Sequence, residues 1–296
     1  MIPTVSIVIP VKNEAEFLPH SISALLKAIT YYGDPAEIII VDNGSTDSTV
    51  EIASSFGCIV LENNDGNISR LRNIGAHAAL GKYLGFIDAD CVVAEFWLTI
   101  CVESLRSGTV GIVGTRAIPD LGNATWVENG WFRLISGVER PDYPFWIGTS
   151  NMLMLRSVFL DVGGFDENLV TAEDVNLCRK VLRNSSIKLE KRIDTIHLRE
   201  SKTIYQLIRR EFWRGKYSVR EALAAGSLIT DWKQNIFYLL NFISLVGIVY
   251  ELMAFNLIAF VLVVSNMFFP IILIVNKRAK IRSFVQFAHV YAVGYL

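Results

Sequence analysis

The amino-acid sequence predicts an α/β domain with a mostly parallel sheet covered by helices on both faces, followed by a C-terminal transmembrane helical hairpin. Two observations carry this prediction. Through the first 115 residues, short apolar runs alternate with helix-length stretches, which is typical of a parallel sheet buried on both faces. Between residues 236 and 275, two apolar runs of about 20 residues are each long enough to cross a bilayer as a helix.

The expected strands are five short apolar runs, which cover residues 5–9, 37–41, 58–61, 83–87 and 110–113. Between the first two runs, apolar residues recur at helical spacing from Leu18 to Ile29 and predict the first helix. Residues 116–170 are less regular, with one short helix expected near 125–137. Two further helices are expected, from residue 172 or 173 to about 184 and over about 203–224.

Three polar clusters directly follow expected strands, at residues 10–14, 42–46 and 88–90. In open α/β sheets the ligand crevice lies beyond the carboxyl ends of the strands. We therefore expect the chemistry of the domain at these clusters.

The overall composition limits the compartment and the partners. A formal net charge of −1 provides no global basic field, which argues against nucleic acid as a partner. The four cysteines show neither metal-ligand spacing nor a disulfide framework, which fits a reducing cytoplasm. The N-terminus runs straight into the first expected strand, without a basic segment or a small-residue cleavage site, so we expect no signal peptide.

The membrane prediction rests on the charge pattern of the last part of the chain. One ionisable residue, Glu251, interrupts the first apolar run (about 236–255), and none interrupts the second (about 257–275). Basic residues flank the pair on both outer sides and are missing from the tip between the runs, which places both ends in the cytoplasm. A buried core hairpin of a soluble protein is the alternative.

We therefore expect a multi-pass protein of the cell membrane, with a cytoplasmic catalytic domain over residues 1–230 and a membrane region over 231–296. A third apolar segment, 284–296, is short for a full span and is open to a re-entrant helix, an interfacial helix or an incomplete span.

Asp88-Ala89-Asp90 ends an expected strand and suggests a metal site. Two carboxylates one residue apart repel each other unless a cation lies between them. Such a pair is well suited to hold Mg²⁺ or Mn²⁺ against a diphosphate, because hard cations prefer oxygen ligands. A helix cap beside a solvated aspartate is the alternative.

Eight motifs, in this order along the chain, resemble those of the family 2 glycosyltransferases. They are residues 6–14, 40–49, 72–75, 79–83, 86–90, 148–151, 163–167 and 172–177. The set covers about residues 4–215, and its order makes it specific. The resemblance implies a glycosyltransferase A fold, with a Rossmann-like nucleotide half and an acceptor half in one domain.

The resemblance also implies a set of nucleotide-sugar-binding residues: Pro10, Asn13, Glu14, Asp42, Arg72, Asp88 and Ala89. Asp42 is expected to accept the ring N–H of a pyrimidine, which favours uracil and a UDP-sugar donor. Arg72 is expected to contact the nucleotide or its phosphates. Turn chemistry after a strand is the alternative for Pro10 and Asn13, and a helix N-cap is the alternative for residues 42–46.

A metal-dependent, inverting transfer is implied by the same resemblance. Asp90 would bind Mg²⁺ or Mn²⁺ directly, Asp88 would hold the ribose or support the metal, and His197 would complete the site. A buried core histidine is the alternative for His197. Asp174 would be the catalytic base that removes the acceptor proton, with Glu173 positioning the acceptor or the helix. Helix capping is the alternative for this pair.

Candidate acceptor or phosphate contacts are Ser150, Asn151, Arg209, Arg210 and Trp213. Processive polysaccharide synthases of the family carry Gln/Arg-x-x-Arg-Trp, whereas here Phe212 stands at the usual Arg and Arg209 at the usual Gln. This departure favours transfer of a single sugar. The basic stretch around Arg209 and Arg210 suits a lipid (pyro)phosphate, an anionic lipid surface or a solvated helix face.

Taken together, the sequence predicts a transferase that moves a sugar from a nucleotide-diphosphate donor to a lipid-linked sugar or polyprenyl phosphate, in surface glycan or glycolipid assembly. A membrane anchor would confine enzyme and acceptor to one layer. The alternatives are a polyprenyl-phosphate sugar synthase that uses a GDP- or UDP-sugar, and an inactive membrane scaffold. A nucleotidyltransferase is disfavoured, because the N-terminal part has no glycine- and lysine-rich phosphate loop.

Overall fold

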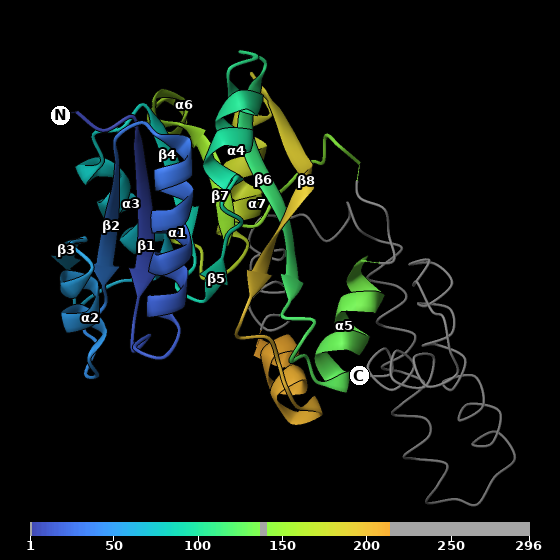
Figure 1. Ribbon diagram of the computed structural model, residues 1–296. Helices are drawn as coiled ribbons and strands as arrows, with labels where there is room; N and C mark the ends of the chain where they lie inside the picture. The colour runs from blue at the N-terminus through green and yellow to red at the C-terminus, as the bar shows by residue number, and fades with distance from the viewer. Residues whose placement is uncertain (1, 137–140, 214–296) are drawn as a thin grey trace, which may run out of the picture. The chain divides into compact units, whose positions relative to one another are not determined.

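The computed structural model describes residues 2–136 and 141–213 (Figure 1). The chain divides into two compact units. The first contains Met1–Asp120 and Arg140–Glu200, and the second contains Leu121–Glu139 and Ser201–Leu296. Each unit is described by itself.

Strands and helices alternate in the first half of the first unit, as the sequence predicts. In chain order its elements are β1 (Val5–Val11), α1 (Leu18–Tyr32), β2 (Ala36–Asp42), α2 (Thr49–Ser55), β3 (Ile59–Glu62), α3 (Ile68–Ala78), β4 (Tyr83–Ile87), β5 (Cys91–Val92), α4 (Trp97–Leu105), β6 (Val110–Pro119), β7 (Asn151–Leu155), α6 (Arg156–Asp161), α7 (Glu173–Val181) and β8 (Ser186–His197).

These strands form one eight-stranded sheet in the order β3-β2-β1-β4-β7-β6-β8-β5. The strands β3, β2, β1 and β4 are parallel. The prediction of a mostly parallel sheet holds for this half. The other half is mixed, since β6 and β8 are parallel, whereas β7 runs antiparallel to β4 and β6, and β5 runs antiparallel to β8. An apolar run in a sequence carries no direction, which explains why the mixed half was not foreseen.

Helices cover both faces of the sheet (Figure 1). Along β1, Ile7 and Ile9 pack with α1 and α4 on one face, while Val8 packs with α3 and α7 on the other. This alternation follows from the two-residue period of a strand. Gly75 lets α3 approach β1, because a Cβ there would lie 2.3 Å from Val8 Cγ1.

The second unit has two described helices, α5 (Trp126–Ser136) and residues 204–213. Each begins with a capping box, in which Thr125 and Glu128, or Thr203 and Gln206, exchange side-chain-to-backbone hydrogen bonds. Buried Val127 and Leu207 pack together with Trp131 and Ile204. The expected helix near 125–137 is confirmed, and the one expected over 203–224 is seen for its first ten residues.

The predicted spans, the third apolar segment and the domain boundary near residue 230 lie outside the described residues. Among residues 2–136 and 141–213, no helix combines the length and the hydropathy needed to cross a bilayer.

Candidate active site

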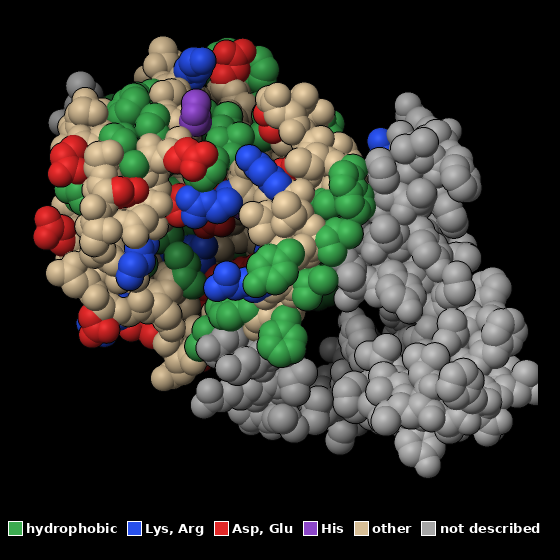
Figure 2. Space-filling model, turned by 90° about the horizontal axis from the view of Figure 1, so that it is seen from below, with side chains coloured by type: hydrophobic (Ala, Val, Ile, Leu, Met, Phe, Trp, Pro, Cys, Tyr) green, Lys and Arg blue, Asp and Glu red, His purple; other side chains and the backbone are tan. Residues whose placement is uncertain are grey.

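Charged side chains gather where β1, β2 and β4 end. Figure 2 views this side of the molecule and shows acidic and basic groups around a hollow. All three polar clusters of the sequence lie at these strand ends, because parallel strands bring their carboxyl ends to one edge of the sheet.

The loops after β1 and β2, which carry predicted nucleotide-binding residues, are tied to each other by hydrogen bonds. Asn13 adopts a left-handed backbone (φ 55°), and its Oδ1 accepts the backbone N–H of Thr46 at 2.7 Å. The backbone N–H of Asn13 donates to Ser45 Oγ at 2.9 Å. Buried Asp42 accepts the N–H groups of Gly44 and Ser45 at 3.0 Å each. The carboxylate of Asp42 therefore closes the turn after β2, while α2 begins later, at Thr49.

Pro10 lies inside β1, and Glu14 follows the strand. The Glu14 carboxylate forms a bidentate ion pair with Arg199, at 2.8 and 2.6 Å. The guanidinium of Arg199 also lies 4.7 Å from the centre of the Phe17 ring. Sequence reasoning missed Arg199, since its only signal is a position two residues beyond His197.

A second arginine joins Asp88, one of the two carboxylates of the predicted metal pair, to the helix of the predicted base. Arg72 is 3% exposed, and its Nη2 and Nη1 lie 2.8 Å from Asp88 and 2.7 Å from Glu173. In the structure the partners of Arg72 are therefore two carboxylates. The sequence predicts that Arg72 contacts the nucleotide or its phosphates. The guanidinium balances part of the negative charge of Asp88 and Glu173. Between Asp88 and Asp90, Ala89 is 5% exposed and packs into the core.

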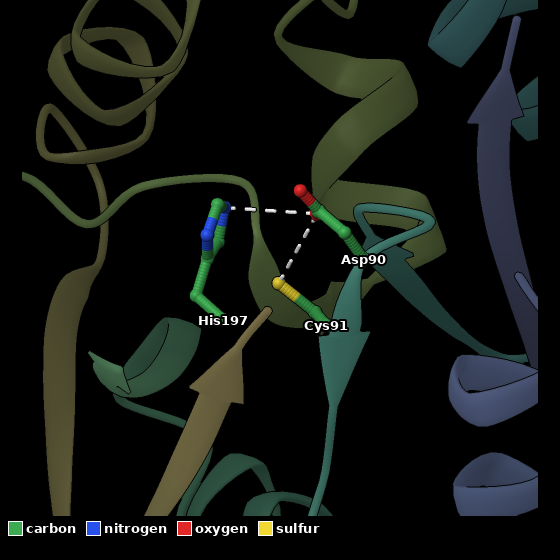
Figure 3. Close-up of side chains that lie close together, drawn as sticks. All are labelled: Asp90, Cys91 and His197. Carbon is green, nitrogen blue, oxygen red and sulfur yellow. Dashed lines mark hydrogen bonds and ion pairs between the residues drawn. The ribbon is translucent and has the colours of Figure 1, made fainter. Parts of the chain in front are cut away.

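Asp90 lies beside Cys91 and His197 (Figure 3). Its Oδ1 is 3.6 Å from His197 Nε2 and 3.9 Å from Cys91 Sγ. The pairing of β5 with β8 sets Cys91 directly opposite His197. Burial raises the pKa of the Asp90 carboxyl, although His197 opposes the shift.

These residues fit a divalent cation. The distance between Asp90 Oδ1 and His197 Nε2 is longer than a hydrogen bond. The lone pairs of the carboxylate oxygen and of a neutral imidazole nitrogen are therefore available to a metal ion between them. Oxygen and nitrogen donors of this kind suit Mg²⁺ or Mn²⁺. A carboxylate oxygen of Glu200 lies 3.6 Å from the other ring nitrogen of His197 and adds negative charge beside the imidazole.

The predicted base opens α7. Asp174 Oδ1 accepts the N–H of Val175 at 2.7 Å, so the side chain also caps the helix locally. Burial raises the pKa of Asp174 to about 6, and the negative charge of Glu173 adds to the shift. A carboxyl with this pKa can accept a proton near neutral pH, as a general base must.

Helix α3 holds the segment that leads into α7. Asn73 exchanges two 3.0 Å hydrogen bonds with the backbone of Phe165, and its amide also donates to the Glu167 side chain at 2.8 Å. Asn67 donates to the carbonyls of Glu167 and Leu169 at 2.7 and 3.0 Å. We call these contacts the α3 clamp. They join the motifs at 72–75 and 163–167 in space, a link that the sequence alone did not reveal.

The predicted acceptor contacts are divided between the two units. The backbone carbonyl of Ser150 accepts the N–H of Asp88 at 3.3 Å, which places it near the metal-side residues. Asn151 is 1% exposed, and its Oδ1 accepts the N–H and the hydroxyl of Thr115 at 2.6 and 2.8 Å, which ties β7 to β6.

The other three, Arg209, Arg210 and Trp213, belong to the second unit. Within that unit, Arg210 lies 5.5 Å from the centre of the Trp131 ring.

Comparison with known proteins places this arrangement in a family. The model of "Glycosyl transferase family 2" matches residues 6–163. Glycosyltransferase AglE of Haloferax volcanii is 27% identical over 230 residues, which cover 74% of each chain. The glucosyl-dolichyl phosphate glucuronosyltransferase of the same organism is 28% identical over 63% of this chain and 67% of its own.

Among solved structures, GalNAc-T7 with UDP, GalNAc and Mn²⁺ matches with a TM-score of 0.53 and 18% identity, over 70% of this chain and 47% of that one. This likeness concerns the fold. The chain spans only 34% and 37% of the length of two bacterial relatives, EpsJ of Bacillus subtilis and GlyG of Streptococcus pneumoniae.

Proposed function

The chain belongs to glycosyl transferase family 2, and we propose that it moves a sugar from a nucleotide-diphosphate donor, a UDP-sugar by preference, to the hydroxyl of a membrane-associated acceptor. One observation carries the proposal. The guanidinium of Arg72 contacts both Asp88, in the D-x-D segment, and Glu173, beside the predicted base. Donor-side and acceptor-side carboxylates are therefore held within the reach of one side chain.

In this proposal each group of residues has one task. The loops around Asn13 and Asp42 bind the base and ribose of the donor. Asp90 and His197 hold Mg²⁺ or Mn²⁺, which when bound stabilises the charge that develops on the leaving diphosphate. Asp174 takes the proton of the acceptor hydroxyl as its oxygen attacks the anomeric carbon from the opposite side, which inverts the configuration.

A UDP-sugar donor is supported by the position of Asp42 at the end of β2 and by the fold shared with GalNAc-T7, whose structure contains UDP and Mn²⁺. A lipid-linked acceptor is supported by the relative named for glucosyl-dolichyl phosphate and by the apolar sequence of residues 236–275. We place the catalytic domain over 1–230 and the membrane region over 231–296, with the domain on the cytoplasmic side. A polyprenyl-phosphate sugar synthase is the second candidate, favoured by the same relative.

The test is calorimetric binding of UDP, GDP and CDP to detergent-purified full-length protein, with and without Mn²⁺. We expect UDP to bind in the presence of Mn²⁺ and Asp90→Asn to abolish this binding. Asp142→Asn is the matched control, since Asp142 pairs with Lys191 on the surface and should not affect binding. Binding of no nucleotide under any condition would contradict the proposal and favour a scaffold. Transfer to a polyprenyl phosphate, with none to lipid-linked sugars, would favour the second candidate.

A further inference from the structure

We propose that Cys91, together with Asp90 and His197, forms a site for a thiophilic divalent cation such as Zn²⁺, in addition to the Mg²⁺ or Mn²⁺ expected there. One ligand atom from each of these residues lies within 4.8 Å of the other two (Figure 3). No cysteine ligand is predicted from the sequence, because Cys91 comes to lie opposite His197 only when β5 pairs with β8.

The spacing suits zinc. Ligands of a tetrahedral Zn²⁺ ion, bound at about 2.0 to 2.3 Å, lie roughly 3.3 to 3.8 Å from one another. The distances from Asp90 Oδ1 are 3.6 Å to His197 Nε2, which lies inside this range, and 3.9 Å to Cys91 Sγ, which lies just beyond it, so a small side-chain adjustment completes the site. Three protein ligands also leave the fourth position of the tetrahedron for water or a ligand oxygen.

The sulfur decides which cation benefits from this arrangement. Magnesium and manganese prefer oxygen donors and gain little from Cys91, whereas thiolate sulfur is a preferred ligand of zinc. As the metal–sulfur bond forms, the S–H bond breaks and its proton passes to solvent, so no oxidation or reduction is involved. Cys91 is completely buried, so the metal has to reach the sulfur from the side of Asp90 and His197.

The two kinds of cation leave different charges at the site. Asp88 is paired with Arg72, which it shares with Glu173, so Asp90 is the carboxylate that remains for the metal. A Mn²⁺ ion bound by the Asp90 carboxylate and a neutral His197 imidazole forms a complex with a net charge of +1, which attracts a diphosphate. With Zn²⁺ on Asp90, a thiolate and a neutral imidazole, the net charge is zero. Zinc would therefore compete with manganese and weaken donor binding, a consequence that rests on the proposed function, whereas zinc binding itself does not.

The experiment is a titration of tag-free, full-length protein in detergent with Co²⁺, a spectroscopic substitute for Zn²⁺. A cobalt–thiolate bond gives a charge-transfer band in the near ultraviolet. We expect the band in the wild type and its removal by Zn²⁺. We expect no band in Cys91→Ser, together with a Zn²⁺ affinity at least about tenfold lower. Cys101→Ser is the matched control, because Cys101 is equally buried, on α4, and should leave the band unchanged.

A band that survives in Cys91→Ser, or cobalt binding to the wild type without a band, would overturn the proposal. X-ray absorption of the zinc-loaded wild type gives an answer even if the variant does not fold: a sulfur neighbour at about 2.3 Å supports the site, and a shell of only nitrogen and oxygen refutes it. Nucleotide binding with Mn²⁺ is measured separately. An absent thiolate bond combined with intact Mn²⁺-dependent UDP binding would refute the zinc site and leave the proposed function standing.

Discussion

Two carboxylates of the first unit, half-buried Asp174 at the start of α7 and buried Glu190 in β8, have opposite pKa shifts. Burial raises the pKa of Glu190, but hydrogen bonds from Arg192 at 2.9 and 2.8 Å, with Lys188 at 3.4 Å, outweigh it and lower the pKa to about 2. Burial raises the pKa of Asp174 to about 6, and its neighbour Glu173 adds a negative charge. The partners, more than the burial, decide which carboxylate stabilises the fold and which can exchange a proton.

The strongest test of this comparison is to remove the base. Asp174→Asn should lower sugar transfer by about 10³-fold, because the amide cannot accept the acceptor proton. Mn²⁺-dependent nucleotide binding should be retained, since the substitution leaves the donor loops intact. Transfer is measured with labelled donor and a lipid extract. A loss of less than about tenfold would remove Asp174 from the role of base.

The opposite member of the pair should affect folding and leave nucleotide binding unchanged. Glu190→Gln should lower the free energy of unfolding at pH 7 by about 2 kcal/mol, a value discounted for the exposure of Arg192. Because the folded pKa lies below the ordinary value of 4.5, the stabilisation is present above pH 4.5 and is lost as the pH falls toward 2.

Urea denaturation at pH 7 and pH 3 measures this difference. Glu103→Gln is the control, since Glu103 is an exposed partner of the same Arg192. Equal effects of the two substitutions would contradict the assigned role of Glu190.

The pH dependence of transfer should report the raised pKa of Asp174. The base acts in its ionised form, so the rate at low substrate should be constant above about pH 6 and fall about tenfold for each unit below it. An acid limb centred near pH 4 would show that Asp174 is not perturbed, or that another group limits the rate. Nucleotide binding measured over the same range separates loss of the base from loss of donor.

Arg72→Lys should move the acid limb upward. Arg72 lowers the pKa of Asp174 through its positive charge, and a lysine ammonium cannot contact Asp88 and Glu173 in the same two-pronged way. We expect the midpoint to lie above that of the wild type and the rate at pH 6 to fall about threefold. A lower rate with an unchanged midpoint would indicate that Arg72 holds the structure without tuning the base.

The smallest effect is expected at Gly148. A Cβ at this position would lie 3.7 Å from Asp174 Oδ2, an ordinary contact that leaves the fold unstrained but occupies space beside the base. Gly148→Ala should raise the acceptor KM by about two- to fivefold and change the free energy of unfolding by less than about 0.5 kcal/mol. Unchanged acceptor kinetics would place the acceptor elsewhere.

The parallel half of the fold could be predicted from the sequence because β1, β2 and β4 are continuous apolar runs, each followed by polar residues. The mixed half could not, since β5 has only two residues and β7 follows a long irregular segment. At the site, Asp90 and His197 were predicted as neighbours through the resemblance, and the structure brings them together. The bridge of Arg72 to Glu173 and the contact of Cys91 with Asp90 depend on side-chain directions that residue spacing does not record.

The α3 clamp also constrains the order in which the protein folds. Its hydrogen bonds join Asn67 and Asn73 to residues 92 to 102 positions later in the chain, so they form only after a large loop has closed. During synthesis, β1 to β4 can assemble first, with α3 packed against them. The segment before α7 can then form its hydrogen bonds with α3. The predicted base on α7 would thus reach the strand ends only after this loop of about a hundred residues has closed.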